Sequence, residues 1–173
     1  MKKITVNSKE FSFSGSNLPV LIHGEDRSGA SLYTITLLAN LYKAGMEVIV
    51  LCGYSMAKEE FEKQVGNGGT FYTKEKEMEF LMEDLNDREN RVICIKNVEM
   101  FSEGTISTIL GNKNIIISGD LNKCPFKNNI LGKPFATKIL FSKLSDTSIP
   151  ELKKYEGFVV AEGMDGAKTS VLL

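Results

Sequence analysis

Residues 18–31 read LPVLIHGEDRSGAS, and this stretch decides the fold. The apolar run at residues 18–22 has the length and composition of a buried parallel strand, with Pro19 placed at its start, where proline is tolerated. From Ser28 the period changes, and apolar residues recur at helical spacing up to Gly45. Gly24 and Gly29 lie between these two segments, in the pattern Gly-x-x-x-x-Gly-Ala-Ser. A strand, a glycine-rich turn and a helix in this order predict a phosphate-binding loop.

The loop contains most elements of a phosphate site but lacks its lysine. Its glycines let successive N–H groups point inward, and the helix N-terminus adds partial positive charge. The hydroxyl group at the last loop position would hold a magnesium ion. The lysine that normally reaches the β- and γ-phosphates is replaced by alanine. The candidate ligand-binding residues are Gly24, Arg27, Ser28, Gly29, Ala30 and Ser31.

Loss of the lysine weakens any catalytic interpretation of the loop. A hydrogen-bond donor aimed at the charge that develops in the transition state typically lowers the activation free energy by about 3 kcal/mol. Arg27 is either a substitute cation or a solvated loop charge. Glu25 and Asp26 place two negative charges beside the expected phosphate position, which opposes anion binding.

The rest of the chain alternates strand and helix patterns, and this predicts one three-layer α/β domain over residues 1–173. The sheet is expected to be mostly parallel, with helices on both faces and short antiparallel strands at the termini. Ser55 is a possible N-cap, Met78 and Met82 are expected in the core, and Pro150 is expected to start a helix. The predicted strands are 4–6, 11–13, 18–22, 47–52, 70–72, 91–95, 114–118, 137–141, 157–161 and 168–172, with turns at 7–9 and 163–166; the predicted helices are 28–44, 55–65, 74–85, 104–110 and 149–155, and residues 119–136 are expected to form a loop with one helical turn.

With these motifs in place, the chain resembles the RecA-like P-loop ATPases, and more loosely their FtsK/HerA-type and secretion-motor branch. Residues 18–51 are similar to that group's Walker A strand, loop, helix and next strand, and RVICIKNVE at 91–99 is similar to a Walker B strand. In the family that strand ends in acidic residues. The matching positions of this chain are occupied by Lys96 and Asn97. Glu99 is the nearest carboxylate and lies too far along to match. NIIISGD at 114–120 is similar to the strand whose polar end senses the γ-phosphate.

The resemblance, with its two departures, implies a degenerate member of the family that does not hydrolyse nucleotide. Such a pseudo-ATPase would serve as a binding or assembly module, and because family members form rings or filaments, it would pair with itself or with an active ATPase paralogue. A second interpretation is a weak nucleotide binder or NTPase that takes ATP or ADP with magnesium. A third is a DNA-associated accessory factor that uses Lys123, Lys127 and Lys133, which are interleaved with Phe126 and Phe135.

Composition narrows the remaining options. The 21 basic and 22 acidic residues give a net charge of −1, which offers no general attraction to nucleic acid or membranes. The three cysteines lack metal-ligand spacing, so we expect buried, reduced thiols and a cytoplasmic protein, without a membrane anchor. His23 is the only histidine and is either a general base or phosphate ligand, or a residue that fills a turn. Asp120 either orients a ligand or caps a turn.

Overall fold

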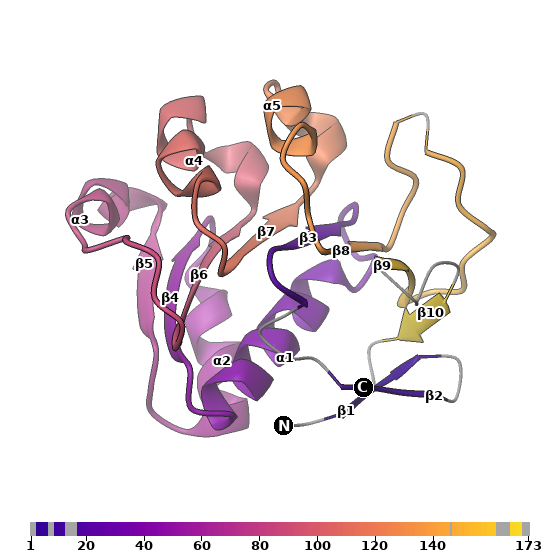
Figure 1. Cartoon of the computed structure of the whole chain (residues 1–173), viewed down its shortest axis with the longest axis horizontal. Helices are drawn as coiled ribbons and strands as arrows, with labels where there is room; N and C mark the ends of the chain where they lie inside the picture. The colour runs from indigo at the N-terminus through magenta and orange to yellow at the C-terminus, as the bar shows by residue number, and fades with distance from the viewer. Residues whose placement is uncertain (1–2, 7–8, 13–16, 146, 162–166, 171–173) are drawn as a thin grey trace.

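The structure is a computed structural model that describes residues 3–6, 9–12, 17–145, 147–161 and 167–170. In this part of the chain ten strands form one sheet, in the order β2-β1-β10-β9-β8-β3-β7-β6-β4-β5 (Figure 1). The strands are β1 Lys3–Val6, β2 Lys9–Ser12, β3 Val20–His23, β4 Glu47–Cys52, β5 Thr70–Thr73, β6 Arg91–Lys96, β7 Ile115–Gly119, β8 Thr137–Leu140, β9 Glu156–Ala161 and β10 Ala167–Ser170.

The sheet is mixed, as predicted. Strands β8, β3, β7, β6, β4 and β5 pair in parallel. Strands β9, β10, β1 and β2 continue the sheet by antiparallel pairing. The predicted strand pair at 4–6 and 11–13 is confirmed where the chain is described, whereas the turns at 7–9 and 163–166 lie wholly or partly outside the described residues.

Helices cover both faces of the parallel part of the sheet. Figure 1 shows α1 and α2 on one side and α3, α4 and α5 on the other. The helical segments are α1 Ala30–Lys43, α2 Met56–Val65, α3 Glu77–Leu81, α4 Glu103–Leu110 and α5 Lys127–Leu131, with 3₁₀ turns η2 Lys74–Lys76, η3 Val98–Met100 and η4 Leu121–Lys123. The three-layer α/β architecture predicted from the alternating pattern is therefore confirmed.

The period of two along each strand divides the core into two clusters. In β3, Val20 and Ile22 pack in the cluster beneath α1 and α2, while Leu21 packs in the cluster beneath α3, α4 and α5. All three side chains are fully buried. A strand covered on both faces is expected to be apolar throughout, which explains the uninterrupted run that marked β3 in the sequence.

The predicted helix at 74–85 is much shorter in the structure, and the expectation that Met78 and Met82 lie in the core is wrong. Residues 74–76 form a 3₁₀ turn and α3 ends at Leu81. Phe80 is fully buried and meets the Tyr72 ring with centroids 5.9 Å apart. Because Phe80 sets the phase of this short helix, Met78 and Met82 point outward and are 70% and 85% exposed.

The helix predicted at 149–155 is absent. Residues 147–153 are irregular, a turn follows, and β9 begins at Glu156. A helix of this length is not stable by itself, so tertiary contacts decide its conformation. Tyr155 supplies such a contact, since a Cβ atom built on Gly29 would lie 3.0 Å from its ring. The loop predicted at 119–136 contains two helical segments, η4 and α5, rather than one turn.

Two serines begin helices and differ in one hydrogen bond. Ser102 caps α4, because its side chain accepts from the N–H of Thr105 at 3.2 Å. Ser55 takes the N-cap position of α2, as predicted, but its side chain makes no capping hydrogen bond. We expect Ser102→Ala to lower the free energy of unfolding by about 1 kcal/mol. Ser55→Ala is the matched control in the same urea titration, and an equal loss in both variants would contradict this assignment.

Candidate functional site

A cavity of about 520 Å³ opens at the carboxyl edge of the parallel strands. The loop before α1 forms one wall, and the segments that follow β4, β6 and β7 form the others. Five of the six predicted site residues line it, namely Gly24, Arg27, Gly29, Ala30 and Ser31. Ser28 does not line the cavity, because its hydroxyl group turns back to accept from the N–H of Ala30 at 3.4 Å. In open α/β sheets this edge is where ligands bind.

The loop reaches α1 through two left-handed residues. Arg27 has φ of 64° and Gly29 has φ of 99°. A side chain at Gly29 would be strained at this φ and would also crowd Tyr155. The turn is closed by the N–H of Ser28, which donates to the carbonyl of Glu25 at 3.1 Å. The local conformation thus explains why glycine stands immediately before the helix.

The N-terminus of α1 is directed at the cavity. The first helical hydrogen bond runs from the N–H of Tyr33 to the carbonyl of Gly29 at 3.0 Å. The N–H groups of Ser31 and Leu32 therefore precede the helical ladder and have no acceptor within the helix. Both residues line the cavity, and the helix dipole gives this end partial positive charge. The arrangement suits an anion.

The loop position that normally carries lysine contributes no cation. Ala30 is 4% exposed, and its Cβ would lie 2.6 Å from a Cβ built on Gly24. Gly24 is therefore held close to the first turn of α1, and its N–H donates to the carbonyl of Gly119 at 3.2 Å. The loop therefore packs closely against the first turn of α1, and position 30 supplies no charge.

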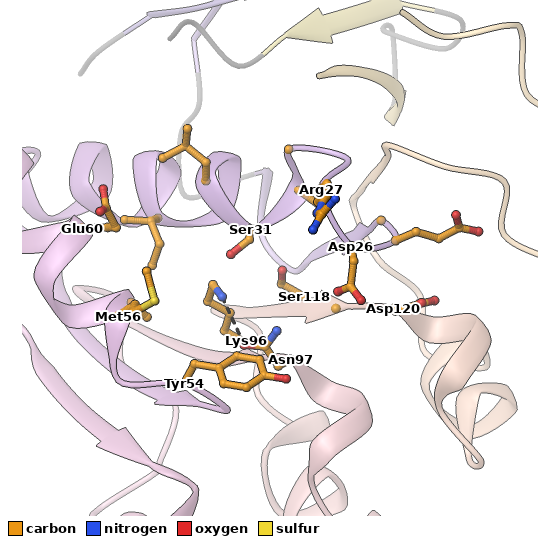
Figure 2. A pocket seen from close by; sticks show the side chains of 18 of the residues that line it. Asp26, Arg27, Ser31, Tyr54, Met56, Glu60, Lys96, Asn97, Ser118 and Asp120 are labelled. Atoms are coloured by element: carbon orange, nitrogen blue, oxygen red, sulfur yellow. Dashed lines mark hydrogen bonds between the residues drawn. The ribbon is translucent and has the colours of Figure 1, made fainter. Parts of the chain in front are cut away.

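A lysine reaches the same cavity from another strand. Lys96 is the last residue of β6 and is 5% exposed. Its Nζ donates to Oδ1 of Asn97 at 3.1 Å, and Figure 2 shows the side chain extending toward Ser31. Burial lowers the pKa of this lysine. In the described part of the chain no carboxylate lies within ion-pair distance of its Nζ.

Charges around Lys96 are sparse. Glu99 raises the pKa of Lys96, but less than burial lowers it. Burial also raises the pKa of the Cys52 and Cys94 thiols, so both are neutral at physiological pH and supply no counter-charge. Lys96 thus lies among uncharged groups, with one carboxylate acting from a distance.

Glu99 lies at the cavity although its sequence position does not match a Walker B residue. Asn97 adopts a left-handed conformation with φ of 63°, and η3 then returns the chain toward β7. Oε2 of Glu99 accepts from the N–H of Asp120 at 3.0 Å. A Cβ built on Gly119 would lie 2.2 Å from the same oxygen. Glu99 thus reaches the cavity without matching the Walker B position, because a turn that spacing alone does not predict brings it back.

Asp120 has both a turn-capping role and a place on the cavity wall. Its Oδ1 accepts from the N–H of Asn122 at 3.1 Å, which caps η4. Its Oδ2 lies 3.2 Å from Nζ of Lys123, and the same ammonium lies 3.4 Å from Oδ2 of Asp26. Lys123 thus joins the loop before α1 to the segment after β7.

The polar end of β7 is engaged in holding α1. The Thr34 hydroxyl donates to the carbonyl of Ala30 at 2.8 Å, and its oxygen lies 2.7 Å from Oγ of Ser118. Because the Thr34 proton is already used, Ser118 must be the donor of the second bond. Ser118 therefore has no proton left for a phosphate oxygen, which differs from the sensor role that the family resemblance implies.

His23 lies at the end of β3 and forms hydrogen bonds with the segments that follow β7 and β8. It does not line the cavity. Its Nδ1 accepts from the N–H of Leu121 at 3.1 Å, so the neutral ring carries its proton on Nε2. That nitrogen lies 3.3 Å from the carbonyl of Lys143 and 3.2 Å from Oγ of Ser142. The side chain is fully buried, and the turn-filling interpretation is the one that this geometry supports.

We expect stability to fall below neutral pH because of His23. Burial lowers its pKa from the ordinary 6.5, so an unfolded chain takes up a proton that the folded chain refuses. The free energy of unfolding therefore decreases as pH falls through 6.5 toward the folded-state pKa. His23→Asn removes this titration and should flatten the pH profile of urea unfolding between pH 7.5 and 5. Parallel profiles for the two proteins would show that His23 is not responsible.

The lysines proposed to touch nucleic acid already have partners in the protein. Nζ of Lys127 donates to Oγ of Ser145 at 2.6 Å, and Nζ of Lys133 donates to the carbonyl of Leu110. Lys123 is the ion-pair bridge described above. Phe126 and Phe135 pack against the core cluster beneath α3, α4 and α5, so they anchor the segment.

Other sequence expectations concern cysteines, metals and membranes. Cys52, Cys94 and Cys124 are buried free thiols, as predicted. Among the described residues, no group of three His, Cys, Asp or Glu side chains is placed to hold a metal ion. No helix in that same part of the chain is both long and apolar enough to span a bilayer.

Comparison with known proteins finds a similar fold among solved structures. No family model and no curated protein matches the chain. A solved structure of EssC (ATPases 2 and 3) from Geobacillus thermodenitrificans superimposes with a TM-score of 0.62 at 12% identity, over 99% of this chain. The fold is similar to that of an ATPase domain. The chain spans 44% of the length of that structure, and at this identity the likeness concerns the fold alone.

Proposed function

We propose that this chain is a single P-loop domain that does not hydrolyse nucleotide and acts in the cytoplasm as a binding or assembly module. The observation that carries the proposal is the buried Lys96 at the end of β6. Magnesium in phosphate sites is held through carboxylates, and a buried ammonium group at that place repels the ion. Together with Ala30, Lys96 removes both the usual cation and the usual metal position.

The assembly part of the proposal is supported by exposed apolar side chains. Met78 and Met82 lie one turn apart at α3 and are 70% and 85% exposed. Tyr54 and Met56, beside the cavity, are 59% and 66% exposed. Methionine and tyrosine at a surface suit contact with another protein. The partner would be a second copy of the chain or an active ATPase paralogue.

The two alternative functions have less support. Weak binding of a nucleotide with magnesium is favoured by Ser31, Arg27 and Glu99, which line the cavity. It is disfavoured by Lys96, whose positive charge repels the magnesium ion. A DNA-associated role would need free cations after β7, whereas Lys123, Lys127 and Lys133 all contact groups of the protein.

The test combines turnover with solution mass. Phosphate release from ATP with excess magnesium should stay at the level of a protein-free control, and Lys96→Met should not change it. The protein should run as more than a monomer, alone or with an ATPase partner. Magnesium-dependent turnover that Ser31→Ala abolishes would refute the proposal, as would a strict monomer that binds no partner.

A further inference from the structure

Lys96 presents an ammonium group to the cavity without an acidic partner in the described residues. Its side chain is 5% exposed, and Asn97 takes one of its three donors at 3.1 Å. Burying a charge is costly unless it is paired. An anion entering the cavity would provide the pairing that the protein itself does not.

A second positive feature faces the same space. Helix α1 has 14 residues and begins at Ala30, on the cavity wall. The N–H groups of Ser31 and Leu32 have no helical acceptor, so they can donate to a ligand oxygen. Figure 2 shows Ser31 above Lys96 and the Tyr54 ring below it. The helix terminus and the lysine come from different elements and converge independently.

Three of the five carboxylates that line the cavity have an ammonium neighbour. Asp26 and Asp120 both lie against Lys123, at 3.4 and 3.2 Å. Glu60 pairs with Lys63 at 2.6 Å. Of the two other lining carboxylates, Glu25 is exposed and screened by salt, and Glu99 accepts from the N–H of Asp120 at 3.0 Å. Arg27 also lines the cavity but is exposed, so Lys96 is the buried ammonium at the cavity that has no ion-pair partner among the described residues.

We propose that this cavity binds a phosphate group that carries no magnesium, with Lys96 on β6 supplying the cation that the loop lacks. The inference rests on the proposed function, because a hydrolysing site would place a metal where Lys96 lies. The ligand is a phosphoryl dianion, from either a nucleotide or a free polyphosphate. Magnesium bound to the same oxygens would compete with Lys96, so the metal-free ligand binds more tightly.

Calorimetry on the whole chain tests this with pyrophosphate and ADP, each first in EDTA and then in excess magnesium. Both ligands should bind in EDTA, and magnesium should weaken binding. Lys96→Met should weaken it by about 10- to 100-fold, since a hydrogen bond to a charged group is lost. Lys113→Met is the matched control, because Lys113 is exposed and precedes β7 at the opposite end of that strand.

The second variant, Lys96→Gln, keeps a hydrogen-bonding side chain without charge and should lose affinity like Lys96→Met. Thermal unfolding without ligand checks that all variants fold. Tighter binding of ADP than pyrophosphate assigns the ligand to nucleotides, and equal binding assigns it to free phosphates. No binding in EDTA, a requirement for magnesium, or unchanged affinity in both Lys96 variants would overturn the inference. The proposed function would be overturned separately, by magnesium-dependent turnover or by a strict monomer that binds no partner.

Discussion

Lys96→Met is expected to raise the free energy of unfolding at pH 7 by an amount on the order of the 1–4 kcal/mol seen when buried ion pairs are replaced by apolar side chains. The wild-type ammonium is 5% exposed and lacks an ion-pair partner among the described residues. Methionine has a similar length and needs no hydrogen bond. Urea unfolding of both proteins at one salt concentration measures the difference.

The gain from Lys96→Met should shrink as pH rises. Burial lowers the pKa of Lys96 in the folded state below its ordinary 10.5. At pH values between the folded-state pKa and 10.5, the unfolded state therefore binds more protons than the folded state. Wild-type stability therefore rises with pH relative to the variant until the unfolded lysine also deprotonates. Lys113→Met should show neither effect. A Lys96→Met protein less stable than wild type at pH 7 would mean that the ammonium has a stabilising partner.

The parallel core of the fold could be predicted because local patterns and tertiary packing agree there. Strands such as β3 and β6 are covered on both faces, so they appear as uninterrupted apolar runs. The helix predicted at 149–155 is absent, and Tyr155 at the end of that segment packs against Gly29, a tertiary contact that the local pattern does not predict. In α3, a single aromatic residue, Phe80, set the phase and placed both methionines outside.

The sequence predicted the loop of the candidate site but not the positions of Lys96 and Glu99 at the cavity. The loop before α1 could be found because its glycines are required by local backbone geometry. Lys96 was recognised as a lost acidic residue, but that its side chain reaches the cavity beside Ser31 depends on how β6 and α1 pack. Glu99 was named but set aside as too far along the chain, because the turn at the left-handed Asn97 was not predicted. An asparagine directly after a buried strand was the available signal for that turn.

The double variant Ala30→Lys with Lys96→Asp should restore a preference for magnesium-bound nucleotide. It returns the cation to the loop and places a carboxylate at the end of β6, where a metal ion needs one. Ala30→Lys alone puts two ammonium groups in one cavity, and like charges about 4 Å apart repel by up to about 4 kcal/mol at a permittivity of 20. Lys96→Asp alone buries a carboxylate near Glu99. Each single variant should therefore be less stable than wild type.

The two changes should couple strongly because both residues line the same cavity. We expect the double variant to be more stable than the sum of the single effects by about 2–3 kcal/mol, near the upper end for neighbouring charges. Urea unfolding of the four proteins gives this coupling, and calorimetry with ADP gives the metal preference. Additivity within about 0.5 kcal/mol would show that the side chains at 30 and 96 do not meet. Tighter ADP binding in EDTA than in magnesium by the double variant would show that the missing metal site has another cause. If both expectations hold, the charge exchange between loop and strand accounts for what separates this cavity from a hydrolysing one.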